Sequence, residues 1–459
     1  MSGEASPAAG WREGELAALA ERWVGEAAPG EALEVALARS VSTTVRAYEG
    51  EVESFTSAQS YGVGVRVIAQ GRLGFAHAGS FDDDVIAEAL AAARDNARFA
   101  EPDEWNGLVE PDGVAQAALE LWRPEALLVP VADKVELALA LERAVRGADP
   151  RIKGVRTAAY SDSAGQTAIA SSAGIRSETR STSAFVSVNA LGEENGETTS
   201  GYGVDAARDP ASLSIEKAAE EAVRQAVRLL GAGQAPSQRV HLLLEPKLAA
   251  TVLGIVAGTL TASMVQKNRS PFADRLGHDI ASPLLSLVDD PTDPASFGAD
   301  PFDGEGLATR ANPLVRGGVL TGFLHNSYTA RRGGVRSTAS AVRSARSTPE
   351  VGVQALAAAP GSGGTFEELL AGIERGLLVQ TMAGLHSGVN PTSGDFSVGA
   401  EGLLIRNGEL AEPVREVTIA STLQRLLLDL CAVGSELERL PGGSTMPPLV
   451  IADVALSGS

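Results

Sequence analysis

Residues 243–263 read Leu-Leu-Glu-Pro-Lys-Leu-Ala-Ala-Thr-Val-Leu-Gly-Ile-Val-Ala-Gly-Thr-Leu-Thr-Ala-Ser. An apolar run from Val240 to Leu244 leads into this stretch and predicts a short strand. Glu245-Pro246 predicts the start of a helix, because proline at the first helical position loses no hydrogen bond. The predicted helix is made of small residues and contains no imidazole, thiolate or carboxylate group.

Several ordered motifs follow this strand–helix unit toward the C-terminus. Residues 301–306 read Pro-Phe-Asp-Gly-Glu-Gly, and residues 326–331 read Asn-Ser-Tyr-Thr-Ala-Arg. Residues 388–400 read Gly-Val-Asn-Pro-Thr-Ser-Gly-Asp-Phe-Ser-Val-Gly-Ala. Any one tripeptide of these motifs is weak evidence, whereas the ordered set is specific.

Together the motifs resemble those of the TldD/PmbA (TldE) peptidase family. In TldD-type members the corresponding helix carries a His-Glu-x-x-x-His zinc motif, and residues 254–259 (Gly-Ile-Val-Ala-Gly-Thr) occupy those six positions. Zinc binds imidazole, thiolate or carboxylate groups, and hydrolysis needs a base beside the metal-bound water. Gly254, Ile255 and Thr259 provide none of these, and Gly442 stands where a late cysteine completes the family's metal site.

The resemblance therefore implies a PmbA/TldE-like member that lacks the zinc motif. We expect no catalytic residue, no metal ligand and no cofactor in this chain. Zinc is expected in a TldD-like subunit that forms a heterodimer with it. The family implies proteolysis of peptides or unfolded protein segments, to which this chain contributes scaffold, interface and peptide-binding surface.

Composition excludes several other classes of protein. The formal net charge of the 459 residues is −20, which argues against binding to nucleic acid or to an anionic membrane, because both need a basic patch. The single cysteine, Cys431, cannot form an internal disulfide and fits a reducing compartment. The N-terminus shows neither a basic nor an apolar targeting region, and no uncharged stretch is long enough to span a bilayer. We therefore expect a cytoplasmic protein.

Hydrophobic periodicity predicts an α+β fold with three units. The first two, residues 1–110 and 111–233, read as N-terminal α/β meander units, with helices at 11–28, 82–99, 131–145 and 215–230. Residues 155–190 predict several short strands broken by Asp162, Gly165 and Gly174. Residues 234–459 predict a large C-terminal TldD/PmbA-type domain rich in antiparallel sheet.

Turn and cap signals define the connections in these units. Glu49-Gly50, Gln70-Gly71, Gly317-Gly318 and Asn407-Gly408 each separate β-prone runs and predict hairpin turns. Thr365 and Glu368 have the spacing of a capping box, which predicts a helix start.

Four residues are candidates for substrate binding. His325, Tyr328 and Arg331 lie in or beside the motif at residues 326–331, and they predict either a peptide groove or a structural support for the Gly317-Gly318 hairpin. Asp395 lies in the long motif, where Gly-Asp is also ordinary turn chemistry.

Two alternative functions remain open from the sequence. A stand-alone peptidase would need a site outside the family motifs, such as a metal held by His278, His325 and Asp395. No two of the five histidines are four residues apart, so no local zinc motif supports this alternative. A non-enzymatic regulator of DNA gyrase would need a clustered acidic stripe, and the acidic residues are instead dispersed among arginines.

Overall fold

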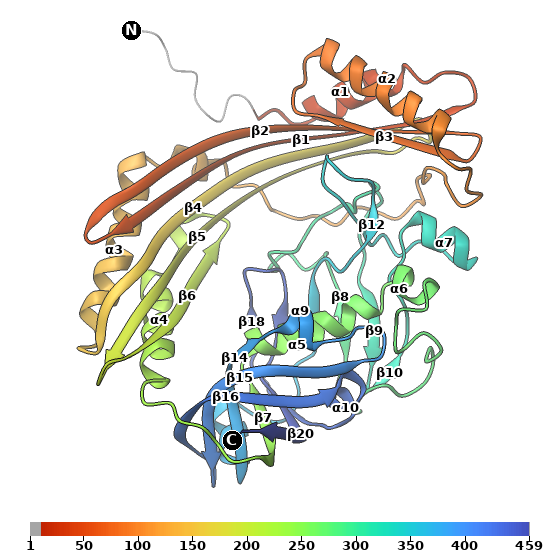
Figure 1. The fold of residues 1–459 in the computed structure, drawn as a ribbon. Coiled ribbons are helices and arrows are strands. Elements are labelled where there is room, and N and C mark those ends of the chain that lie inside the picture. The colour runs from red at the N-terminus through yellow and green to blue at the C-terminus, as the bar shows by residue number, and fades with distance from the viewer. Residues whose placement is uncertain (1–10, 459) are drawn as a thin grey trace.

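The computed structural model describes residues 11–458, so residues 1–10 and 459 of the predicted terminal domains lie outside the described residues. A long curved sheet arches over a compact C-terminal part (Figure 1). The predicted α+β class is confirmed, including the C-terminal domain rich in antiparallel sheet.

The arch is a six-stranded antiparallel sheet in the order β3-β2-β1-β4-β5-β6. Its strands are β1 (Glu31–Tyr48), β2 (Glu51–Ala69), β3 (Arg72–Ala78), β4 (Ile152–Ser171), β5 (Arg176–Glu194) and β6 (Glu197–Ala207). Because β1 pairs with β4, the two predicted N-terminal units share one sheet. The boundaries near residues 110 and 233 stay a prediction.

The predicted hairpin turns are confirmed. Glu49 and Gly50 join β1 to β2 with φ values of 54° and 81°. Gln70 and Gly71 join β2 to β3 with φ values of 53° and 73°. Two-residue turns with positive φ match the right-handed twist of the flanking strands.

The predicted breaks at Asp162 and Gly165 are wrong, because β4 runs through both residues without interruption. The Asp162 carboxylate lies 2.5 Å from the Lys134 Nζ atom and accepts a hydrogen bond from the Tyr160 hydroxyl. These tertiary partners satisfy the carboxylate, so it does not need the local turn that its residue type favours. Gly174, with a φ of 96°, does lie in the turn between β4 and β5.

Helices cover both ends of the arch (Figure 1). α1 (Glu15–Val24) and α2 (Asp83–Phe99) pack over one end, and α3 (Val131–Ala148) and α4 (Ile215–Arg228) pack over the other. α1 is shorter than the predicted helix at residues 11–28, because Gly14 precedes it in a left-handed conformation with a φ of 78°. Short 3₁₀ turns lie at Pro124–Leu128 and Pro210–Ser212.

The C-terminal domain is built around a closed ring of strands. β16, β15, β14, β7 and β20 pair in succession, β16 also pairs with β20 and so closes the ring, and β17 extends the sheet from β20. The bounds are β7 (Gln238–Leu244), β14 (Arg375–Ala383), β15 (Asp395–Arg406), β16 (Glu409–Thr422), β17 (Leu430–Val433) and β20 (Leu449–Ser457). The predicted Asn407-Gly408 turn joins β15 to β16.

A second sheet, in the order β10-β9-β8-β13-β19-β18, and a two-stranded ladder of β11 and β12 complete this domain. The bounds are β8 (Leu287–Asp289), β9 (Asn312–Arg316), β10 (Val319–Leu320), β11 (Ala341–Val342), β12 (Glu350–Val351), β13 (Leu356–Ala358), β18 (Glu438–Arg439) and β19 (Thr445–Met446). The predicted turn at Gly317-Gly318 joins β9 to β10.

Short helices connect these strands. They are α5 (Pro246–Thr259), α6 (Ala262–Gln266), α7 (Ser327–Gly333), α8 (Phe366–Ala371), α9 (Leu385–Gly388) and α10 (Leu423–Leu428). The strand–Pro–helix unit predicted at residues 240–263 is confirmed as β7 and α5. The predicted capping box of Thr365 and Glu368 is formed at the start of α8.

A buried ionic cluster joins the arch to the C-terminal domain. Arg66 of β2 donates to Glu34 of β1 at 2.6 Å and lies 3.8 Å from Glu305. Arg343, from the loop between β11 and β12, also pairs with Glu34. Glu305 in turn accepts hydrogen bonds from the backbone N–H and the hydroxyl of Ser327. Through Glu305, the 301–306 motif therefore contacts both the arch and the rest of the C-terminal domain.

Candidate functional site

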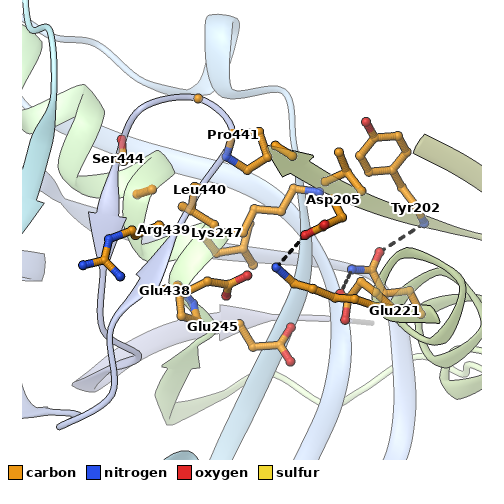
Figure 2. A pocket seen from close by; sticks show the side chains of 18 of the residues that line it. Tyr202, Asp205, Glu221, Glu245, Lys247, Glu438, Arg439, Leu440, Pro441 and Ser444 are labelled. Carbon is orange, nitrogen blue, oxygen red and sulfur yellow. Dashed lines mark hydrogen bonds and ion pairs between the residues drawn. The ribbon is translucent and has the colours of Figure 1, made fainter. Parts of the chain in front are cut away.

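A cavity of about 1150 Å³ lies between the β6 end of the arch and the C-terminal domain. β6 and α4 form one wall, the start of α5 lies opposite, and residues 436–444 close a third side (Figure 2). Apolar surface comes from Phe185, Leu248, Phe297, Phe366 and Leu437. This mixture of apolar walls and convergent polar groups is typical of a ligand site.

The wall at β6 presents an open strand edge. β6 is the last strand of the arch and pairs only with β5 among the described strands. The Tyr202 N–H points away from β5, since it donates to the Gln225 side chain at 3.3 Å. Backbone direction alternates along a strand, so the N–H and C=O groups of Val204 and Ala206 face the same outer side. Both residues line the cavity.

The position of β6 is fixed by close packing against α4. Gly201 and Gly203 lie directly under the helix, and a Cβ atom on Gly203 would stand 1.8 Å from the Ala218 carbonyl oxygen. Asp205 points to the same helix, where it accepts from the Ser214 N–H at 2.9 Å and pairs with Lys217 at 3.0 Å. The side chains of the residues that alternate with these, Tyr202, Val204 and Ala206, therefore point away from the helix and face the cavity.

Charged side chains line the cavity, and several of them are paired across elements. Glu245, which precedes α5, pairs with Arg228 of α4 at 2.9 Å. The Lys247 Nζ atom lies 4.8 Å from the centre of the Tyr202 ring, in a cation–π contact. These contacts join the start of α5 to the wall formed by α4 and β6.

Glu438 is a carboxylate of the cavity lining without a direct partner. It makes no hydrogen bond or ion pair with any residue between 11 and 458, and its side chain points into the space beside Glu245 (Figure 2). Desolvation raises the pKa of Glu438; Lys217 opposes the shift, whereas Glu221 and Glu245 reinforce it. Glu438 can therefore accept a hydrogen bond or a positive charge from a ligand.

The family's zinc does not fit the residues at its expected positions. Gly254 has no side chain, and apart from its own helix no neighbouring group lies within 4 Å of the place where its Cβ would stand. Thr259 is buried, and its hydroxyl donates to the Val256 carbonyl at 2.6 Å. Gly442 lines the cavity with open space around its Cβ position. Neither α5 nor the 436–444 segment contributes an imidazole or thiolate.

Tyr328 and Arg331 lie together, but outside this cavity. They line a separate space of about 270 Å³ beside the Arg66–Glu305 pair. The Tyr328 hydroxyl donates to Asp103 at 2.8 Å, and Arg331 donates to the carbonyl oxygens of Trp105 and Gly107 at 2.8 and 2.9 Å. Burial lowers the pKa of Arg331. A peptide would have to displace the segment at residues 103–107 to reach these groups.

His325 and Asp395 are separated from each other and from the cavity lining. His325 is half-buried beside Thr338, whose hydroxyl accepts from the His325 N–H at 2.7 Å. Its Nδ1 atom is buried without a hydrogen-bond partner, and burial lowers the pKa of the imidazole. Asp395 is exposed at the start of β15 and accepts from the Ser393 hydroxyl at 2.6 Å.

Residues 11–458 contain no cluster of three or more His, Cys, Asp or Glu side chains arranged to hold a metal ion. His278, His325 and Asp395, the ligands of the stand-alone alternative, therefore do not form such a cluster. Within the same residues, every helix is too short or too polar to cross a membrane.

Sequence reasoning missed most of the cavity. The sequence indicated two segments of the cavity lining: the start of α5, which Glu245 precedes, and the segment that contains Gly442 at the late ligand position. The contribution of β6 and α4 was not visible, because their side chains meet α5 only after the arch has curved over the C-terminal domain.

Comparison with known proteins gives a consistent result over nearly the whole chain. Family models for the PmbA/TldA metallopeptidase match as domain 1 at residues 33–97, the central domain at 124–230 and the C-terminal domain at 237–458. Metalloprotease PmbA of Escherichia coli O157:H7 is 28% identical over 408 residues, which cover 88% of each chain. A metalloprotease TldD homolog of Haemophilus influenzae is 24% identical over 430 residues, covering 87% of each chain. The crystal structure of TldE from Thermococcus kodakarensis superposes with a TM-score of 0.87 at 25% identity, covering 96% of this chain and 99% of that chain.

Proposed function

The chain belongs to the PmbA/TldA metallopeptidase family, and we propose that it is a subunit that binds peptide without holding zinc itself. A TldD-like partner supplies the zinc site in a heterodimer. This chain supplies scaffold, interface and a peptide-binding wall for proteolysis of peptides or unfolded segments. We place the complex in the cytoplasm, in keeping with the single cysteine.

One observation supports the proposal: the positions that align with the family's zinc ligands carry no donor groups, and a cavity lies beside one of them, Gly442. A catalytic zinc site needs three protein ligands and an open coordination position. Gly254 and Gly442 have no side chain, and the buried Thr259 hydroxyl donates to the Val256 carbonyl. The cavity of about 1150 Å³ lies beside the edge of β6.

The β6 edge suggests how the peptide is held. An extended peptide can add to a free strand edge, where main-chain hydrogen bonds supply affinity and read little of the sequence. The outward groups of Val204 and Ala206 are suited to this pairing. Such binding favours unfolded segments, because their backbone N–H and C=O groups are free to pair with the strand edge.

The binding mode is tested with Val204→Pro and Val204→Thr. Proline removes an outward N–H without breaking the ladder to β5, whereas threonine keeps the backbone and the side-chain volume. We expect Val204→Pro to weaken binding of a fluorescent unstructured peptide at least about tenfold, the effect of losing about 1.4 kcal/mol of hydrogen bonding. Val204→Thr should bind like the wild type. Equal affinity for all three proteins would refute strand addition.

The subunit role is tested by mixing the chain with the TldD-like homologue of its own genome. We expect a larger assembly and peptidase activity that neither chain shows alone. Unchanged oligomer size and unchanged activity would end the proposal, whatever the peptide-binding result.

A further inference from the structure

The cavity beside β6 has an excess of negative charge. Eight acidic and four basic side chains line it, and no histidine does. One further cation, Arg228 of α4, lies outside the lining and pairs with Glu245 at 2.9 Å. A cavity with low-dielectric walls focuses the field of the charges that line it. This cavity therefore attracts cations and repels anions.

Glu438 differs from three other carboxylates of the cavity walls, each of which has a cation as its direct partner. Those pairs are Asp205–Lys217 at 3.0 Å, Glu245–Arg228 at 2.9 Å and Glu221–Arg224. Glu438 has no such partner among residues 11–458, and Figure 2 shows its side chain directed into the space beside Glu245. Its chain neighbour Arg439 points to the other side of β18, because successive residues of a strand alternate in direction. A cation that enters the cavity therefore meets a carboxylate that no side chain has paired.

Apolar side chains of the same lining suit a long cationic side chain better than a bare metal ion. Leu437, next to Glu438, is 42% exposed, and Phe297 and Phe366 also line the cavity. Lysine and arginine bury their methylene stems on apolar surface while the charged head stays with polar groups. A metal ion would instead need several ligands, and residues 11–458 contain no group of three His, Cys, Asp or Glu side chains that could hold one.

A peptide on the β6 edge would bring such side chains into the cavity. An added strand would lie about 4.8 Å from β6, and its side chains would alternate between the two faces of the sheet. Every second residue would then lie on the face of Tyr202, Val204 and Ala206, which is the face that lines the cavity. Glu438 lines the cavity from another element, β18, and is exposed to the same space (Figure 2).

We propose that the cavity selects peptides that carry a lysine or an arginine, whose charged head donates to the Glu438 carboxylate. This inference rests on the proposed peptide binding at β6 and adds to it the class of substrate. Glu438 is then a specificity-determining residue, and the nearby carboxylates of Glu221 and Glu245 add to the negative field around it. A peptide with an acidic residue at the same place is disfavoured, because it brings a like charge to Glu438.

The selection is tested with three fluorescent unstructured peptides that differ only in a central lysine, glutamine or glutamate. The full chain should bind the lysine peptide at least about tenfold more tightly than the glutamine peptide, because a hydrogen bond between charged groups contributes more than a neutral one. Glu438→Gln should abolish this preference, and Glu438→Lys should reverse it in favour of the glutamate peptide. Glu374→Gln is the matched control, because it removes the same charge from an exposed residue outside the cavity lining, and it should keep the full preference.

Equal affinity of the wild type for the lysine and glutamine peptides would overturn the inference, and so would a lysine preference that survives in Glu438→Gln. Circular dichroism confirms that the variants fold. The glutamine peptide separates this inference from the proposed function. If that peptide binds and loses affinity in Val204→Pro, strand addition stands even when the lysine preference is absent. If none of the three peptides binds, the proposed peptide binding and this inference fail together.

Discussion

Replacing Arg66 with methionine tests the buried cluster that joins the arch to the C-terminal domain. The Arg66 side chain is 6% exposed and that of its partner Glu34 is 1% exposed, so the pair is removed from water. Methionine keeps most of the side-chain volume but leaves Glu34 with Arg343 alone and removes the Arg66–Glu305 pair. Removing one partner of a buried ion pair lowers the free energy of unfolding by about 3–5 kcal/mol, and we expect a loss of this size for Arg66→Met.

The assay is guanidinium denaturation followed by both tryptophan fluorescence and far-UV circular dichroism. All four tryptophans lie between residues 11 and 122, so fluorescence reports the N-terminal part while circular dichroism reports the whole chain. Arg22→Met is the matched control. Its partner Asp83 and Arg22 itself are more than half exposed, and such pairs contribute about 0–1 kcal/mol.

At acidic pH the wild type and Arg66→Met should differ less in their free energy of unfolding than at pH 7. Burial alone would raise the pKa of Glu34, but Arg66 and Arg343 hold it below its usual value. A lowered folded-state pKa gives stability that is present above the unfolded value of 4.5 and is lost as pH falls through the folded value. The role assigned to the cluster would be refuted if Arg66→Met lowered the free energy of unfolding by less than about 1 kcal/mol at pH 7. It would also be refuted if the difference in this free energy between the two proteins grew in acid.

Two further substitutions probe the packing of the arch. Gly203→Ala should destabilise the chain by about 2 kcal/mol or more, because the new Cβ would press on the Ala218 carbonyl, whereas Gly147→Ala meets open space and should be neutral or stabilising in thermal unfolding. Tyr328→Phe should cost about 0.5–1.5 kcal/mol by removing the hydroxyl donor to Asp103, and it should leave the affinity for the fluorescent peptide unchanged. A loss of peptide affinity with unchanged stability would instead restore Tyr328 as a substrate-binding residue.

Local signals in the sequence predicted the local features of the fold. Positive φ values at Glu49-Gly50 and Asn407-Gly408 follow from residue type and spacing, as does the capping box at Thr365. The prediction failed where a tertiary contact competed with a local preference. Asp162 reads as a strand breaker, yet Lys134, from the helix that precedes β4, pairs with its carboxylate within β4.

The candidate site was harder to predict for a geometrical reason. Its residues come from β6, α4, the start of α5 and the 436–444 segment, which approach one another only through the curvature of the arch. Tyr328 and Arg331 stood out as motif residues, but their polar groups are already bound to residues 103–107. A prominent motif marked an internal contact here, whereas the open cavity is lined by residues without a conspicuous motif.

The zinc content of the chain purified alone, measured by elemental analysis without added chelator, tests the metal-free role most directly. We expect a value near zero, because Gly254, Thr259 and Gly442 offer no imidazole, thiolate or carboxylate where the family's zinc would bind. A value near one zinc per chain would contradict it, and the chain would then have to be treated as a hydrolase in its own right.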